Sequence, residues 1–145
     1  MWIALAAALI DRLTKAAVEA SGRRGVLIPG IVNLRPVENR GVAFSMLWGK
    51  PLLLGLFTAA LIAGVTAWLI ARPDAPRLAR AGLWMIVGGG LGNLYDRLFS
   101  GGVTDFIDLA FVRFAVFNVA DVFICVGAAL VVIDAWRKEK KRAKL

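Results

Sequence analysis

The chain has 145 residues, of which 59% are hydrophobic, and no histidine. Soluble domains average roughly 45–50% apolar residues, so this composition predicts a single-domain integral membrane protein. The lack of histidine excludes serine–histidine and cysteine–histidine catalytic sites and most zinc sites. Seven of the eight net positive charges come from residues 71–80 and 137–145, a distribution that fits cytoplasmic membrane segments and not a nucleic-acid-binding surface.

The N-terminal third of the chain predicts one helix followed by a surface segment. The apolar start continues to about residue 20, and a helix over 2–20 would be on the order of 30 Å long, enough to cross a bilayer. Its polar residues Asp11, Thr14 and Lys15 share one face. Glycines and prolines interrupt residues 21–50, which predicts short strands and turns in a small extracytoplasmic β-rich cradle on the membrane surface.

Two further helices are expected before residue 100. Residues 51–71 contain no charged residue and make the clearest membrane span. A third helix is predicted over 79–98, with a glycine run at 88–90 that lets a neighbouring backbone approach closely. Its last turns carry three polar residues at helical spacing: Asn93, Asp96 and Arg97. We expect Asp96 and Arg97 to pair with each other or across helices, and in weighing the aspartates we take Arg97 as the partner of Asp96.

The C-terminal part of the chain is predicted as a loop over 99–113 and a fourth helix over 114–136. Asn118 and Asp121 are three residues apart and share one face of that helix, with Asp121 about 10 Å into the span. Asp134 is expected at the opposite membrane interface, and Cys125 as a buried apolar residue.

The sequence therefore predicts an all-α membrane protein with four transmembrane helices and both termini in the cytoplasm. In this arrangement the polar groups of the first, third and fourth helices fall in the outer leaflet. The loop residues Asn39 and Asp105 lie on the same side. Ionisable groups at membrane depth cost roughly 2.5–3.5 kcal/mol each on insertion scales, so their convergence indicates one outward-facing site.

Two neighbouring carboxylates suit the chemistry of such a site. One of them keeps a proton while the other acts as a base, and together they can activate a water molecule. Periodicity leaves three aspartates as candidates for the pair, Asp105, Asp108 and Asp121. Two other functions compete with an aspartic hydrolase: a small proton- or ion-conducting transporter subunit and a structural membrane subunit whose polar groups fasten helices together.

Five sequence boxes in this order resemble the lipoprotein signal peptidase, or signal peptidase II, family. They are DRLTK (11–15), ENRGVAF (38–44), GGGLGNLYDR (88–97), VTDFID (103–108) and FNVAD (117–121). Together they cover nearly the whole chain. Only nine residues separate Met1 from Asp11, fewer than in many family members, which would put the native start upstream.

The resemblance implies an aspartic peptidase of the bacterial cytoplasmic membrane. Such an enzyme removes the signal peptide of a diacylglyceryl-modified prolipoprotein by cleaving before the lipidated cysteine. The implied catalytic pair is Asp105 and Asp121, which would hold a water between them without metal, cofactor or covalent intermediate. We expect a monomer that contacts its substrate and membrane lipids. Seven residues match positions that line or support the family's site: Asn39, Asn93, Arg97, Asn118, Asp11, Lys15 and Asp96.

Overall fold

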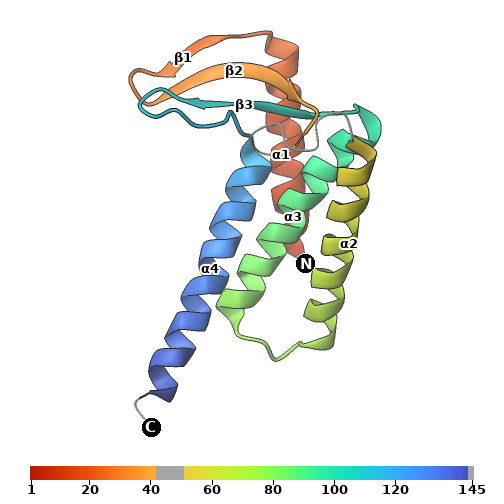
Figure 1. The fold of residues 1–145 in the computed structure, drawn as a ribbon, viewed down its shortest axis with the longest axis vertical. Helices are drawn as coiled ribbons and strands as arrows, with labels where there is room; N and C mark the ends of the chain where they lie inside the picture. The colour runs from red at the N-terminus through yellow and green to blue at the C-terminus, as the bar shows by residue number, and fades with distance from the viewer. Residues whose placement is uncertain (42–50, 144–145) are drawn as a thin grey trace.

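The computed structural model describes residues 1–41 and 51–143, which form four helices and three strands (Figure 1). The helices are α1 (Trp2–Ser21), α2 (Pro51–Ala71), α3 (Arg77–Phe99) and α4 (Val119–Arg142), and the strands are β1 (Gly25–Ile28), β2 (Val32–Asn39) and β3 (Val103–Leu109). The predicted mostly helical fold with a small sheet is thereby confirmed. The end of the ENRGVAF box and the rest of the predicted surface segment, residues 42–50, lie outside the described residues.

The sheet covers one end of the helices and is antiparallel, in the order β1-β2-β3 (Figure 1). Strand β3 lies within residues 99–113, which the sequence predicted as a loop, so that prediction is wrong. Its hydrogen-bonding partner is β2, in which Val37 lies opposite Asp105 and Asn39 opposite Val103. The pairing joins segments more than sixty residues apart. The residue pattern within one short segment does not reveal a pairing partner so distant in the sequence.

Helix α3 is the centre of the bundle and packs against α1, α2 and α4. Its glycine run permits this. A side chain at Gly88 would overlap the backbone of Ala4 in α1, and one at Gly89 would overlap the carbonyl of Ala120 in α4. The expected close approach of neighbouring backbones is therefore observed on two sides of α3.

Helix α4 begins five residues later than predicted. Asn118 caps it, accepting a hydrogen bond from the backbone N–H of Asp121 at 3.0 Å, while the Asp121 carboxylate accepts one from the backbone N–H of Asn118 at 3.2 Å. Residues just before the cap stay extended, because Phe117 exchanges backbone hydrogen bonds with Ile107 of β3. This capping box places Asp121 in the first turn of the helix and not deep in the span.

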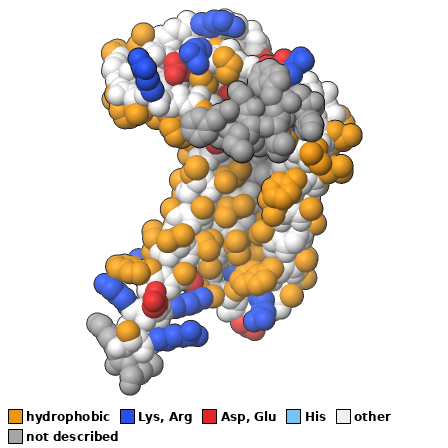
Figure 2. Space-filling model, in the orientation of Figure 1, with side chains coloured by type: hydrophobic (Ala, Val, Ile, Leu, Met, Phe, Trp, Pro, Cys, Tyr) orange, Lys and Arg blue, Asp and Glu red, His pale blue; other side chains and the backbone are white. Residues whose placement is uncertain are grey.

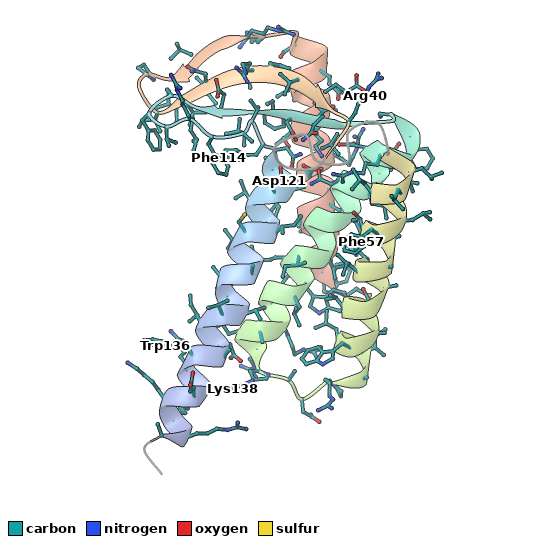
Figure 3. The ribbon with its side chains drawn as sticks, in the orientation of Figure 1. Arg40, Phe57, Phe114, Asp121, Trp136 and Lys138 are labelled. Atoms are coloured by element: carbon teal, nitrogen blue, oxygen red, sulfur yellow. The ribbon has the colours of Figure 1, made fainter. Side chains whose placement is uncertain are left out.

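The middle of the molecule presents a belt of apolar side chains, with most basic residues near its two ends (Figure 2). In the described part of the chain, α2 and α4 are the helices long and apolar enough to cross a membrane by length and composition. Large exposed side chains on the belt include Phe57 on α2 (Figure 3). Cys125 is exposed on α4, so its predicted burial is wrong: the apolar run around it forms outer surface.

Candidate active site

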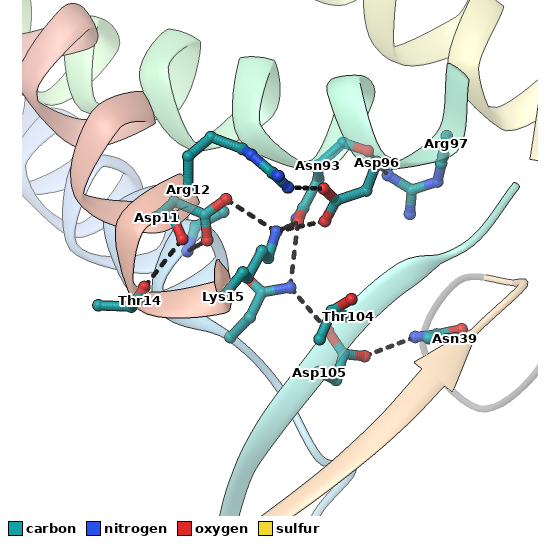
Figure 4. Close-up of polar contacts among 12 residues, drawn as sticks. Asp11, Arg12, Thr14, Lys15, Asn39, Asn93, Asp96, Arg97, Thr104 and Asp105 are labelled. Atoms are coloured by element: carbon teal, nitrogen blue, oxygen red, sulfur yellow. Dashed lines mark hydrogen bonds and ion pairs between the residues drawn. The ribbon is translucent and has the colours of Figure 1, made fainter. Parts of the chain in front are cut away.

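Asp105 projects from β3 into the space between the sheet and the helix ends. Its two carboxylate oxygens are held by two different asparagines: Asn39 Nδ2 donates to Oδ2 at 2.9 Å, and Asn118 Nδ2 donates to Oδ1 at 2.7 Å (Figure 4). The residue is only 3% exposed. Asn39 ends β2 and Asn118 caps α4, so the sheet and the bundle together fix this carboxylate.

Asp121 provides a second carboxylate at the same end of the bundle, beneath the sheet (Figure 3). Its Oδ1 accepts a hydrogen bond from Asn93 Nδ2 at 2.8 Å, and its Oδ2 is the acceptor in the capping box. Unlike Asp105, it is only partly buried. One carboxylate of this site is therefore shielded, whereas the other reaches the surface.

Asn118 and Asn93 connect the two carboxylates. Through its side chain Asn118 binds Asp105, and through its backbone N–H it binds Asp121. Asn118 Nδ2 also donates to Asn93 Oδ1 at 3.0 Å, and Asn93 in turn donates to Asp121. Both asparagines are buried, at 0% and 6% exposure. The two aspartates thus belong to one hydrogen-bonded unit, although they are sixteen positions apart in the sequence.

A buried ion cluster lies behind Asn93. Lys15 is fully buried, and its ammonium group lies 2.8 Å from Asp11 Oδ2, 2.7 Å from Asp96 Oδ2 and 3.0 Å from Asn93 Oδ1 (Figure 4). Asp11 also accepts the backbone N–H of Ala120 at 2.9 Å. Since Lys15 donates to the Asn93 oxygen, the amide nitrogen of Asn93 is turned toward Asp121.

Burial dominates the electrostatics of Asp105. Loss of hydration raises the pKa of its carboxyl from the ordinary 3.8 to about 6, and the nearby charge of Asp121 also raises it. The hydrogen bonds from Asn39 and Asn118 and the charge of Lys15 lower the pKa, but by less. Asp105 can therefore hold a proton at a pH where an exposed carboxyl would be ionised.

Most of the polar residues predicted to converge do meet at this end of the molecule. Asp108, the third candidate for the catalytic pair, lies outside the cluster, on β3, 3.9 Å from Arg35. Thr14 donates to the backbone carbonyls of Ile10 and Asp11 in its own helix. Arg97 donates to the backbone carbonyl of Asn93 at 3.2 Å.

Asp96 pairs across helices, which is one of the two arrangements left open, and the choice of Arg97 as its partner is wrong. Asp96 instead pairs with Lys15 and with Arg12, whose Nη1 lies 2.7 Å from Asp96 Oδ1. Arg12 also stacks on the ring of Tyr95, 4.6 Å from its centroid. Sequence reasoning did not select Arg12. Its position beside Asp11, in the otherwise apolar first helix, is the signal that could have identified it.

In the described ranges, no three His, Cys, Asp or Glu side chains are grouped as ligands for a metal ion. The chemistry of the cluster rests on carboxylates, amides and the buried ammonium group. Two carboxylates joined by shared donors, one of them with a raised pKa, can divide one proton between them and handle a water molecule as acid and base.

Comparisons with known proteins identify the family. The family model described as signal peptidase (SPase) II matches residues 3–137. The chain belongs to the signal peptidase II family. Lipoprotein signal peptidase of Thermosynechococcus vestitus is 36% identical over 141 residues, covering 93% of this chain and 89% of that protein. Its counterpart in Aeromonas hydrophila is 38% identical over 151 residues, covering 98% and 90%.

Solved structures share the fold as well. A bacterial membrane enzyme determined by the in meso method at 2.3 Å resolution superposes with a TM-score of 0.89 at 26% identity, covering 97% of this chain and 88% of that one. A second such enzyme, at 1.9 Å resolution, gives a TM-score of 0.83 at 27% identity, covering 92% and 90%. As a member of the signal peptidase II family, the protein is a peptidase with the fold of bacterial membrane enzymes.

Proposed function

We propose that the protein removes signal peptides from diacylglyceryl-modified prolipoproteins by cleaving before the lipidated cysteine. The relatives that support this are named lipoprotein signal peptidases. Asp105 and Asp121 are its catalytic pair. Asn39, Asn93 and Asn118 orient the two carboxylates, and Arg97 lines the site beside Asn93.

The observation that carries the proposal is the shared donor Asn118. It is fully buried and binds Asp105 through its side chain and Asp121 through its backbone. A residue that only capped α4 would not need the side-chain hydrogen bond to Asp105. A residue that only held β3 in place would not need the backbone hydrogen bond to Asp121. Joint orientation of two carboxylates is what an aspartic peptidase requires.

The mechanism follows from the difference in burial between the two aspartates. Asp105, the more buried, carries the shared proton, while ionised Asp121 takes a proton from the water held between them. The water oxygen attacks the scissile carbonyl as Asp105 protonates the carbonyl oxygen. When the intermediate collapses, the C–N bond breaks, the leaving amine receives the proton held by Asp121, and Asp105 regains its own from the former carbonyl oxygen. No covalent intermediate with the enzyme forms, and no cofactor takes part.

The four helices span the bacterial cytoplasmic membrane, with both termini in the cytoplasm and the sheet outside. The hydropathy of α2 and α4 supports this directly. Helices α1 and α3 carry charged groups, but their buried ones, Asp11, Lys15 and Asp96, form one ion cluster inside the bundle. Arg12, which pairs with Asp96, balances the remaining negative charge of that cluster. The chain acts as one monomeric domain, with the substrate's acyl chains in the bilayer and its scissile bond beneath the sheet.

The test compares three near-isosteric variants on a diacylglyceryl-modified prolipoprotein in detergent. Asp105→Asn and Asp121→Asn should each lower kcat/KM by at least about 1,000-fold, because each removes one partner of the acid–base pair. Asp108→Asn is the matched control: it changes a carboxylate of the same strand that lies outside the cluster, and it should retain activity within about twofold, since no residue of the pair depends on it.

Folding of each variant is checked by its melting temperature. Substantial cleavage by a folded Asp105→Asn or Asp121→Asn protein would refute the assigned pair. If the folded wild-type protein did not cleave the substrate at all, a proton-flux assay in proteoliposomes would test the transporter alternative.

A further inference from the structure

A groove opens at the end of the molecule opposite the sheet. It has a volume of about 860 Å³ and runs along α3, between α2 and the C-terminal half of α4. Trp68 of α2 and Leu83 of α3 line its apolar part, and four charged residues of α4 line its rim: Asp134, Lys138, Glu139 and Arg142. Figure 3 shows Lys138 on the lower turns of α4, far from Asp121. The candidate active site does not use this groove.

The apolar part of the groove has room for a hydrocarbon chain. A Cβ added to Gly64 of α2 would meet no atom within 4 Å, so open space lies directly beside the helix backbone. Small side chains, such as Ala79 of α3 and Ala135 of α4, also line it. In a bilayer a groove that opens to the surrounding lipid is in contact with lipid tails, because its apolar walls offer water too few polar partners.

The rim and its surroundings are basic. Residues 72–80 and 134–142 together contain eight lysines and arginines but only three acidic residues. One of the three, Asp134, is neutralised by Lys138 at 2.9 Å. Blue side chains gather at this end of the molecule in Figure 2. Basic pockets between helices on the cytoplasmic side are suited to anionic lipid headgroups.

We propose that this groove binds an anionic phospholipid of the cytoplasmic leaflet. One acyl chain lies along α3 beside Gly64 and Trp68, and the phosphate group is held by Arg142 and Lys138. Charge decides between a lipid and a substrate helix as the occupant. Signal peptides begin with a positively charged region, which the surplus of basic residues at this end would repel, whereas it attracts a phosphate.

The experiment measures phosphatidylglycerol and phosphatidylcholine binding to the full chain in detergent by native mass spectrometry. Wild type should bind phosphatidylglycerol more tightly. The double variant Lys138→Gln/Arg142→Gln should weaken that binding about 25-fold, since each basic residue near an anionic headgroup contributes about fivefold. Its matched control is Lys140→Gln/Lys141→Gln, which removes the same charge outside the groove lining and should cost less than about threefold, because only long-range attraction is lost.

A second pair of variants tests the apolar part with all charges retained. Gly64→Leu fills the groove and should weaken phosphatidylglycerol binding at least fivefold, whereas Ala63→Leu, on the neighbouring exposed position of α2, should leave it unchanged. Equal affinity for both lipids, or an unchanged affinity in both Gly64→Leu and Lys138→Gln/Arg142→Gln, would overturn the proposal. So would displacement of the lipid by a synthetic signal-peptide helix, which would assign the groove to the substrate. None of these outcomes depends on peptidase activity.

Discussion

The two ends of the molecule each contain an aspartate and a lysine four residues apart in a helix, and the two pairs differ in burial. In α1, Lys15 and Asp11 are 2.8 Å apart, and both side chains are 0% exposed. In α4, Lys138 and Asp134 are 2.9 Å apart, but only the aspartate is shielded: its side chain is 12% exposed and that of the lysine 54%. The same local spacing thus produces an interior ion cluster at one end and a surface ion pair at the other.

The difference shows what each pair can do. The interior pair at the sheet end has further partners, Asp96 and Asn93, and through Asn93 it reaches the candidate catalytic carboxylates. The pair at the opposite end lies at the rim of a groove, where it remains open to ligands. Burial, and not spacing, makes the first pair part of a rigid site.

Replacing the lysine of each pair by methionine gives the largest expected contrast in stability. Lys15→Met should lower the free energy of unfolding by about 3–5 kcal/mol, because it leaves the buried carboxylates of Asp11 and Asp96 short of a positive charge. Lys138→Met should lower it by at most about 1 kcal/mol, because the ammonium group that is lost stands in solvent, where an ion pair contributes little. Reversible unfolding in mixed detergent measures both values. Similar losses for the two variants would contradict the distinction drawn between the ends.

Two glycines offer a smaller contrast. A Cβ at Gly92 of α3 would overlap the Asp11 carboxylate, whereas one at Gly64 of α2 would meet open space. Gly92→Ala should therefore destabilise the protein by about 1–3 kcal/mol through overpacking. Gly64→Ala should stabilise it by up to about 1 kcal/mol through helix propensity. The same unfolding assay measures both, and a neutral Gly92→Ala would show that Asp11 can move without loss.

The pH dependence of cleavage gives the smallest effect and concerns the sheet end alone. Since the pKa of Asp105 is raised to about 6, the pair holds its proton below that pH and loses it above. The value of kcat/KM should therefore fall about tenfold per pH unit on the alkaline side. Asn39 stabilises the charged form, so Asn39→Ala should raise the pKa and move this decline up by about one pH unit.

Asn33→Ala serves as the control for this measurement. Asn33 lies on the same strand as Asn39 but pairs in register with Asp108, away from the cluster, so the alkaline decline should stay where it is in wild type. A decline that moved to lower pH in Asn39→Ala would mean that Asn39 favours the neutral carboxyl.

Much of the fold could be predicted from local patterns. The uncharged run at 51–71 coincides with α2, and the polar spacing at 11–15 predicted the shared face of Asp11 and Lys15. Residues 114–118 were assigned to a helix as the start of a largely apolar run, yet they precede α4, and Phe117 pairs with Ile107 of β3. An apolar run alone does not distinguish a helix from a buried extended segment.

The sequence by itself determined which residue types make up the site, because apolar helices force their few charged groups to gather where they can neutralise one another. The order of the five boxes also indicates the family. Which groups meet was decided only in three dimensions. Periodicity left Asp105, Asp108 and Asp121 open, and it did not decide whether Asp96 pairs with Arg97 or across helices. The alignment of β3 with β2 brings Asn39 to Asp105, and the cap of α4 brings Asn118 to both aspartates. Such contacts depend on strand register and helix packing between distant segments, which no local spacing encodes.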